Sequence, residues 1–221
     1  MSTDASTKMK VPTNSTFEPL PGILLATGGL CFFTAGVLHP AGHQGQDFKT
    51  AIVSMLSDKM WPAAHLCALV SAFFIAWSLF LLLDKTEKTA ASAIRLGIIS
   101  TVFMAIEFSV ELAARTEVSR IATDGASPLL SLVDAMQAVG WPFFALAFVL
   151  LAVSTHWSPL WVRVAGVLGA CALAVGGLVV QGLHVLALGP VFIVGNALAF
   201  WMIWAGIHIA LNGLKKRRKN F

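Results

Sequence analysis

The sequence predicts an all-α polytopic integral membrane protein with six transmembrane helices, and three observations lead to this fold class. Of the 221 residues, 57% are hydrophobic and only 12% are charged, whereas a soluble domain has about 25% charged residues. The mean hydropathy is +0.79. The apolar runs are about 18–25 residues long, enough for a helix to cross a hydrocarbon core of about 30 Å.

The apolar runs occur in six places along the chain. The expected spans are residues 21–38, 61–83, 90–114, 128–154, 161–185 and 190–212. The second span opens with Trp61-Pro62, an interfacial aromatic residue beside a proline that the first helical turn tolerates. The fourth follows Ser127, a residue type that caps helix N-termini. In the fifth, Gly176-Gly177 can interrupt the helix.

The first loop after span one contains an amphipathic pattern. Phe48, Ile52, Met55, Leu56 and Met60 recur at helical spacing. This pattern predicts a short amphipathic helix lying in the membrane interface. Such a helix would cover a pocket, and ordinary packing of a loop is the alternative.

The distribution of lysine and arginine predicts the orientation. With both termini in the cytoplasm, eleven of these residues lie inside and four outside, as the positive-inside rule favours. We therefore expect a disordered cytoplasmic tail at 1–20, a transmembrane domain at 21–213 and a basic cytoplasmic tail at 214–221. The expected location is the plasma (inner) membrane, with the site facing the outside or periplasm.

Six ionisable residues from five of the expected spans come to one depth. A charged side chain at the bilayer centre costs about 2.5–3.5 kcal/mol on insertion scales, so chains retain such groups where they are paired or useful. Because the six groups converge in the outer half of the bilayer, we expect a polar pocket that faces outward. They are His39, His65, Glu107, Glu111, Asp134 and His184.

The carboxylates of the third span share one helical face. Glu107 and Glu111 are four residues apart, and they repel each other unless a cation, a proton or a basic partner lies between them. An ion pair between Glu111 and Arg115, one turn further on, is the structural alternative. Asp134 has its own structural alternative, a hydrogen bond to a neighbouring helix.

A metal site is the first functional hypothesis. Imidazole and carboxylate ligands without thiolates suit a divalent ion, Zn²⁺ or Fe. Glu107 and Asp134 are the candidate catalytic residues, for example as the general base of a metal-assisted hydrolysis. The candidate metal ligands are His39, His65, Glu107, Glu111 and His184.

Haem b is the second candidate cofactor, with redox chemistry as its function. His65 and His184 would be its axial ligands, and Arg115 would bind a propionate. In the inner half of the spans only His208 is a candidate, which argues against a two-haem electron wire and against a symmetric ion path.

Two further classes of function stay open, and so does the question of whether the protein is an enzyme. Carboxylates and histidines within spans are typical of proton relays, so a small proton-coupled transporter is one alternative. A non-catalytic subunit of a membrane complex is the other. The expected partners are the lipid bilayer, further copies of the chain, and a small molecule or lipid that reaches the outer leaflet. Nucleic acid is not expected.

Overall fold

The computed structural model describes residues 19–40, 47–125, 127–181, 183–185 and 188–218. The predicted tail at 1–20 therefore lies outside the described residues except for its last two positions, and so do residues 219–221. Within the described ranges the secondary structure is helical and contains no strand. The all-α prediction is confirmed for this part of the chain.

Six helices of the described chain are long and apolar enough to cross a membrane, as predicted. Prolines stand in the first turn of three of them, α1, α3 and α6, where a missing N–H costs nothing. Ser127 caps α6 by accepting a hydrogen bond from the Leu130 amide at 3.0 Å. The six stretches lie on α1 (Leu20–Leu38), α3 (Trp61–Leu83), α4 (Lys88–Ala114), α6 (Pro128–Ser154), α7 (Leu160–Val175) and α8 (Val191–Arg218). The stretch on α7 continues beyond the α-helix to Val180.

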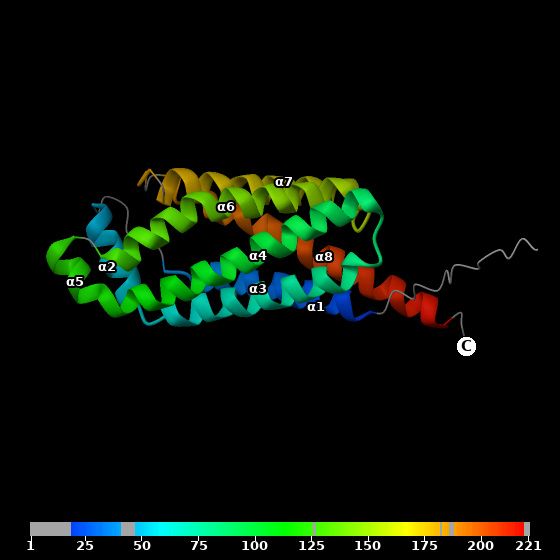
Figure 1. The fold of residues 1–221 in the computed structure, drawn as a ribbon, viewed down its shortest axis with the longest axis horizontal. Helices are drawn as coiled ribbons and strands as arrows, with labels where there is room; N and C mark the ends of the chain where they lie inside the picture. The colour runs from blue at the N-terminus through cyan, green and yellow to red at the C-terminus, as the bar shows by residue number, and fades with distance from the viewer. Residues whose placement is uncertain (1–18, 41–46, 126, 182, 186–187, 219–221) are drawn as a thin grey trace, which may run out of the picture.

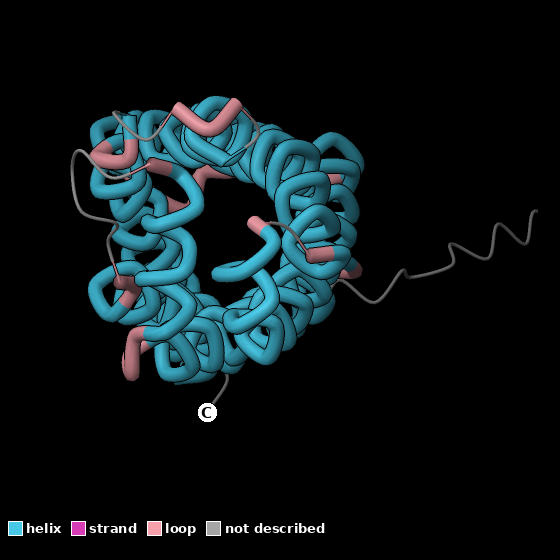
Figure 2. Tube along the Cα trace, turned by 90° about the vertical axis from the view of Figure 1, so that its left-hand side faces the viewer, coloured by secondary structure: helices cyan, strands magenta, loops and turns pink. Residues whose placement is uncertain are grey.

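The long helices form a closed ring in chain order. Each packs against the next one along the chain, with α3 following α1, and α8 returns to pack against α1. Figure 2 shows this ring end-on, and Figure 1 shows it from the side. Alternate helices run in opposite directions, so α1 and α4 end where α3 and α6 begin, and the candidate residues come to that one end of the bundle.

Aromatic side chains fill the inside of the ring. Trp141 and Phe144 of α6 lie 6.1 Å apart between ring centroids, Phe144 and Phe148 lie 4.4 Å apart, and Phe148 lies 6.2 Å from Trp201 of α8. All four are buried, from 0% exposed at Phe148 to 9% at Trp141. We call these four residues the aromatic column. The outer faces carry exposed apolar side chains such as Phe80 and Ile193, as lipid contact requires.

Two glycines allow the last helix to approach its neighbours closely. A Cβ on Gly22 of α1 would lie 2.4 Å from the backbone oxygen of Gly206 in α8. A Cβ on Gly169 of α7 would lie 2.2 Å from the backbone nitrogen of Leu198. Small residues at helix crossings let backbones pack directly in membranes, and here they close the ring at both sides of α8.

Three shorter elements lie at the end of the bundle that carries the candidate residues. Helix α2 (Phe48–Ser57) is the predicted amphipathic helix, and its Ile52, Met55 and Leu56 are buried. A 3₁₀ turn, η1 (Arg115–Glu117), leads from α4 into α5 (Val118–Asp124). α2 and α5 lie side by side across the left end of the molecule in Figure 1.

The fifth span differs from its prediction. The α-helix ends at Val175 and a π-helical segment, η2 (Gly176–Gln181), follows it. A Cβ on Gly177 would lie 2.4 Å from Cβ of Trp141, so the glycine lets α6 pack against this segment. π-segments are wider than α-helix and often mark functional sites. His184, placed at the end of the span by sequence, therefore lies beyond the helical segment, with a φ of 57°.

Candidate functional site

A buried pair formed by His65 and Glu111 is the centre of the candidate site. His65 lies in the second turn of α3 and Glu111 near the end of α4, and they are 2% and 3% exposed. Nε2 of His65 is 2.9 Å from Oε2 of Glu111. Nδ1 of the same ring is 2.8 Å from the backbone oxygen of Trp61, one turn earlier.

This geometry restricts the protonation states in which both ring nitrogens of His65 are hydrogen-bonded. A backbone carbonyl only accepts hydrogen bonds, so Nδ1 must donate to the Trp61 oxygen. If Nε2 donates to Glu111, the ring is an imidazolium beside a carboxylate. If Nε2 accepts instead, Glu111 must be the protonated donor. In both arrangements His65 and Glu111 together hold one proton more than a neutral histidine and a free carboxylate.

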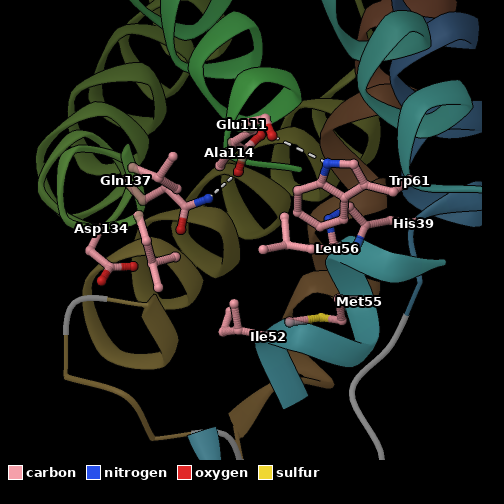
Figure 3. Close-up of a pocket in the computed structure, with 11 residues that line it drawn as sticks. His39, Ile52, Met55, Leu56, Trp61, Glu111, Ala114, Asp134 and Gln137 are labelled. Atoms are coloured by element: carbon pink, nitrogen blue, oxygen red, sulfur yellow. Dashed lines mark hydrogen bonds between the residues drawn. The ribbon is translucent and has the colours of Figure 1, made fainter. Parts of the chain in front are cut away.

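Helix α6 completes the environment of Glu111. The amide nitrogen of Gln137 donates to Oε1 of Glu111 (Figure 3). Nε1 of Trp61 donates to the backbone oxygen of Glu111 at 3.3 Å. Both carboxyl oxygens of Glu111 are therefore occupied, and its contacts join α3, α4 and α6. The predicted alternative of an ion pair with Arg115 is not what the structure shows, since Glu111 pairs with His65.

Glu107 lies one turn deeper on α4 and is completely buried, at 0% exposure. The side chains of Gln137 and Trp141 are near its carboxyl group, but neither of its oxygens has a hydrogen-bond partner within the described structure. The amide oxygen of Gln137 also lacks a partner there. Buried polar groups are nearly always hydrogen-bonded, so the orphaned atoms at this one place are unusual.

Asp134 and His184 form a second, more open pair at the rim. Nε2 of His184 is 3.6 Å from Oδ2 of Asp134, and their side chains are 45% and 24% exposed. His39, directly after α1, places its ring 5.2 Å from that of His65 between centroids. The predicted residues thus separate into a buried pair, a deep carboxyl group and a rim pair, with His39 beside the first.

A small pocket connects the rim with the buried pair. Its polar lining residues are His39, Glu111, Asp134 and Gln137, and Trp61 lines it as well. The space open to water-sized molecules is about 30 Å³, which is room for about two waters. Apolar walls come from α2 (Ile52, Met55, Leu56), from α6 (Leu130, Val133) and from Ala114 of α4 (Figure 3).

The geometry does not support the predicted metal and haem sites. Within the described residues, no group of three or more histidine, cysteine, aspartate and glutamate side chains could hold a metal ion. Both ring nitrogens of His65 already face acceptors, and the pocket is far smaller than a porphyrin. The candidate catalytic residues Glu107 and Asp134 lie at different levels, the first below the pocket and the second at its rim.

Sequence reasoning missed two residues that organise the site. The sequence expectations do not include Gln137, although its amide joins α6 to Glu111. Trp61 was interpreted as an interface anchor, although its indole bonds the end of α4. The available signal was an amide within a membrane span, which needs a polar partner for the same reason that a carboxylate does.

Comparison of the chain with protein-family models, with curated proteins and with solved structures finds no match. Its six candidate membrane-spanning helices suggest an integral membrane protein, and its fold is a ring of helices with a buried acid–histidine site at one end.

Proposed function

We propose that this chain is a proton-linked membrane carrier whose proton-binding groups are the His65–Glu111 pair and Glu107. One observation carries the proposal. Both nitrogens of the buried His65 ring face acceptors, Glu111 at 2.9 Å and the Trp61 carbonyl at 2.8 Å. The pair therefore holds an exchangeable proton in a place from which bulk water is excluded.

Glu107 supports the proposal as a second proton site. An isolated carboxylate in an apolar environment is so costly that such groups usually take up a proton instead. Glu107 has no hydrogen-bond partner among the described residues and lies next to Glu111, which is already paired. As a carboxylic acid it carries no charge, and it gains a hydrogen-bond donor beside the side chains of Gln137 and Trp141.

Access to these groups comes from one side. The pocket extends from Asp134 to Glu111, whereas the aromatic column begins beside Glu107 with Trp141 and continues to Trp201 near the other end of the ring. The lysine and arginine distribution favours an outward-facing pocket. Release to the other side requires a rearrangement of helices, as alternating access does in carriers.

Infrared difference spectroscopy tests the proton site directly. Purified protein in lipid vesicles is compared at acidic and alkaline pH, and the stretching band of a protonated carboxyl group is followed in H₂O and D₂O. We expect a buried carboxylic acid band in the wild type that disappears in Glu107→Gln. The matched control is Asp124→Asn, which removes an exposed carboxyl group of α5 and should leave the band unchanged. A wild-type spectrum identical to that of Glu107→Gln would refute the proposal and favour a structural role for the polar residues.

A further inference from the structure

A second cluster of buried apolar side chains covers the candidate site. It is separate from the main core, and its members come from α2, α3, α4, α5 and α6. We call it the cap cluster. In the part of the chain that the structure describes, no residue of α2 belongs to the main core. The clustered apolar side chains of α2 therefore all belong to the cap cluster.

A polar layer separates the two clusters. Three helices pass from the cap cluster to the main core, and on each of them a buried polar side chain of the candidate site lies between the two. These side chains are His65 on α3, Glu111 on α4 and Gln137 on α6. Because the clusters share no buried side chain, the cap cluster can loosen without opening the main core. The cap-cluster and main-core residues that flank the three polar residues are, respectively, Trp61 and Ala68, Ala114 and Phe108, and Val133 and Trp141.

Helix α2 forms the outer wall of the pocket. Ile52, Met55 and Leu56 line it (Figure 3), and all three are buried. Although the pocket reaches Glu111, that residue is only 3% exposed and its partner His65 only 2%. The space of about 30 Å³ admits about two waters. With α2 in this position, exchange between the buried pair and bulk solvent is restricted to those few waters.

One exposed hydrogen bond joins α2 to a neighbouring element among the described residues. Nζ of Lys49 donates to the backbone oxygen of Thr123, near the C-terminal end of α5, at 3.4 Å. A lysine is favoured at a helix C-terminus, but a bond of this length is weak. At its other end α2 is joined to α3 by a turn at residues 58–60, in which the Asp58 carboxyl group accepts a hydrogen bond from the Met60 amide at 2.7 Å.

We infer that α2 is the outer gate of the acid–histidine site. It pivots on residues 58–60, and the bond between Lys49 and Thr123 is the latch that opening releases. This inference rests on the proposed function and names what regulates access to its proton site. Lids commonly move about a few residues at the ends of elements, and they belong to the parts of a protein that open at low cost. Opening exposes Glu111 and Asp134 to solvent while the helices of the ring stay in place.

Modification of a cysteine beneath α2 tests the gate. The three native cysteines, Cys31, Cys67 and Cys171, are replaced by alanine, and the purified full-length protein is placed in lipid nanodiscs. Leu56→Cys puts a thiol on the pocket side of α2, and Ser57→Cys puts one on its exposed side. A membrane-impermeant methanethiosulfonate should modify Ser57→Cys rapidly and Leu56→Cys slowly but completely. A Leu56→Cys thiol that never reacts would overturn the inference.

Release of the latch should raise the rate on the pocket side only. Lys49→Ala removes the hydrogen bond to Thr123, so we expect Leu56→Cys to react about twofold to tenfold faster, the change that loss of one ordinary hydrogen bond produces. The rate at Ser57→Cys should stay the same. The matched control is Lys88→Ala, which removes an exposed lysine at the opposite end of the bundle. Equal rates at Leu56→Cys in the two lysine variants would refute the gate.

Hydrogen exchange at Glu107 connects the gate with the proton site. After transfer of the protein from H₂O to D₂O, the infrared band of protonated Glu107 shifts as its proton exchanges, and the rate of the shift reports access from solvent. We expect a faster shift in Lys49→Ala than in Lys88→Ala, by a similar factor. Equal rates of the shift in these two variants would show that solvent reaches the site without passing α2, which contradicts the inference.

The two proposals fail separately. If the Glu107 band is present but Lys49→Ala changes neither the thiol reaction nor the shift, the gate is wrong and the proton-linked function stands. If the band is absent while Lys49→Ala speeds the reaction of Leu56→Cys, the proton-linked function is wrong, and α2 opens the pocket without regulating a proton site on Glu107.

Discussion

Glu111 and His65 come from different helices and meet at 2.9 Å with almost no exposure to solvent. They are 46 positions apart in the sequence, and the remainder of α3 and most of α4 lie between them. The pair fixes α3 against α4, and the amide of Gln137 extends the connection to α6. A change at either partner should therefore affect both proton binding and the stability of the ring.

Breaking the pair at one side should destabilise the protein strongly. Removal of one partner from a buried ion pair typically costs about 3–5 kcal/mol because the other is left uncompensated. We expect such losses for His65→Leu and for Glu111→Leu, and a loss well below their sum for the double variant. The measurement is the free energy of unfolding of the wild type, the two single variants and the double variant. It is followed in mixed micelles as the fraction of denaturing detergent rises, which completes a double-mutant cycle. Additive losses would show that the two groups do not interact.

Replacing Glu107 by leucine should stabilise the fold while it abolishes the proton site. The substitution removes a buried carboxyl group that has no hydrogen-bond partner among the described residues. Leaving such a group unpaired costs the native state about 1–3 kcal/mol. For a chain of this size each kcal/mol raises Tm by about 2–4 °C. Thermal unfolding in a mild detergent measures the change. A lower Tm for Glu107→Leu than for the wild type would show that its carboxyl group is paired in the native protein.

Asp47 should make the start of α2 sensitive to acid. Hydrogen bonds from the Thr50 hydroxyl at 2.6 Å and from the Thr50 amide at 3.0 Å lower the pKa of the Asp47 carboxyl group. The stabilisation of this cap is therefore fully present above the unfolded pKa of about 3.9 and is lost as the pH falls through the lower folded pKa.

The amide resonance of Thr50 in a nuclear magnetic resonance titration reports this transition. We expect it to move with a midpoint below about pH 3.9 in the wild type. In Asp47→Asn it should remain constant, because asparagine caps a helix without titrating. A midpoint above that value would show that the hydrogen bonds from Thr50 do not stabilise the carboxylate.

Gly169 should not tolerate a methyl group. The new Cβ would lie 2.2 Å from the backbone nitrogen of Leu198, so α7 and α8 would have to move apart. We expect Gly169→Ala to lower Tm by several degrees. Gly36→Ala is the control, since its Cβ would meet the side-chain oxygen of Asn196 at 2.8 Å, an atom that can rotate away. Equal Tm values for Gly169→Ala and Gly36→Ala would show that the backbones of α7 and α8 lie further apart at Gly169 than the structure places them.

The sequence by itself determined the six long helices and the amphipathic α2. Both depend on local properties, the length and hydropathy of a run and the period of its apolar residues. The gathering of the ionisable groups at one end of the bundle followed too, because helices that alternate in direction bring the C-terminal ends of the first, third and fifth spans beside the N-terminal ends of the second and fourth. The fifth span was predicted to continue to residue 185, whereas its α-helix ends at Val175, directly before the Gly176-Gly177 pair that the sequence marks as able to interrupt it. That a π-helical segment follows and packs Gly177 against Trp141 is a property of two helices rather than of one.

The tertiary structure alone decided which of these groups meet. Glu111 had Arg115 one turn away along its own helix, yet it pairs with His65 of α3. Helical periodicity gives the direction of a side chain relative to its own axis, but the rotation of one helix against another depends on how all the faces pack. That packing leaves the carboxyl oxygens of Glu107 and the amide oxygen of Gln137 buried without hydrogen-bond partners among the described residues. It also covers the pocket with α2 and places His184 at the rim, away from the deeper groups.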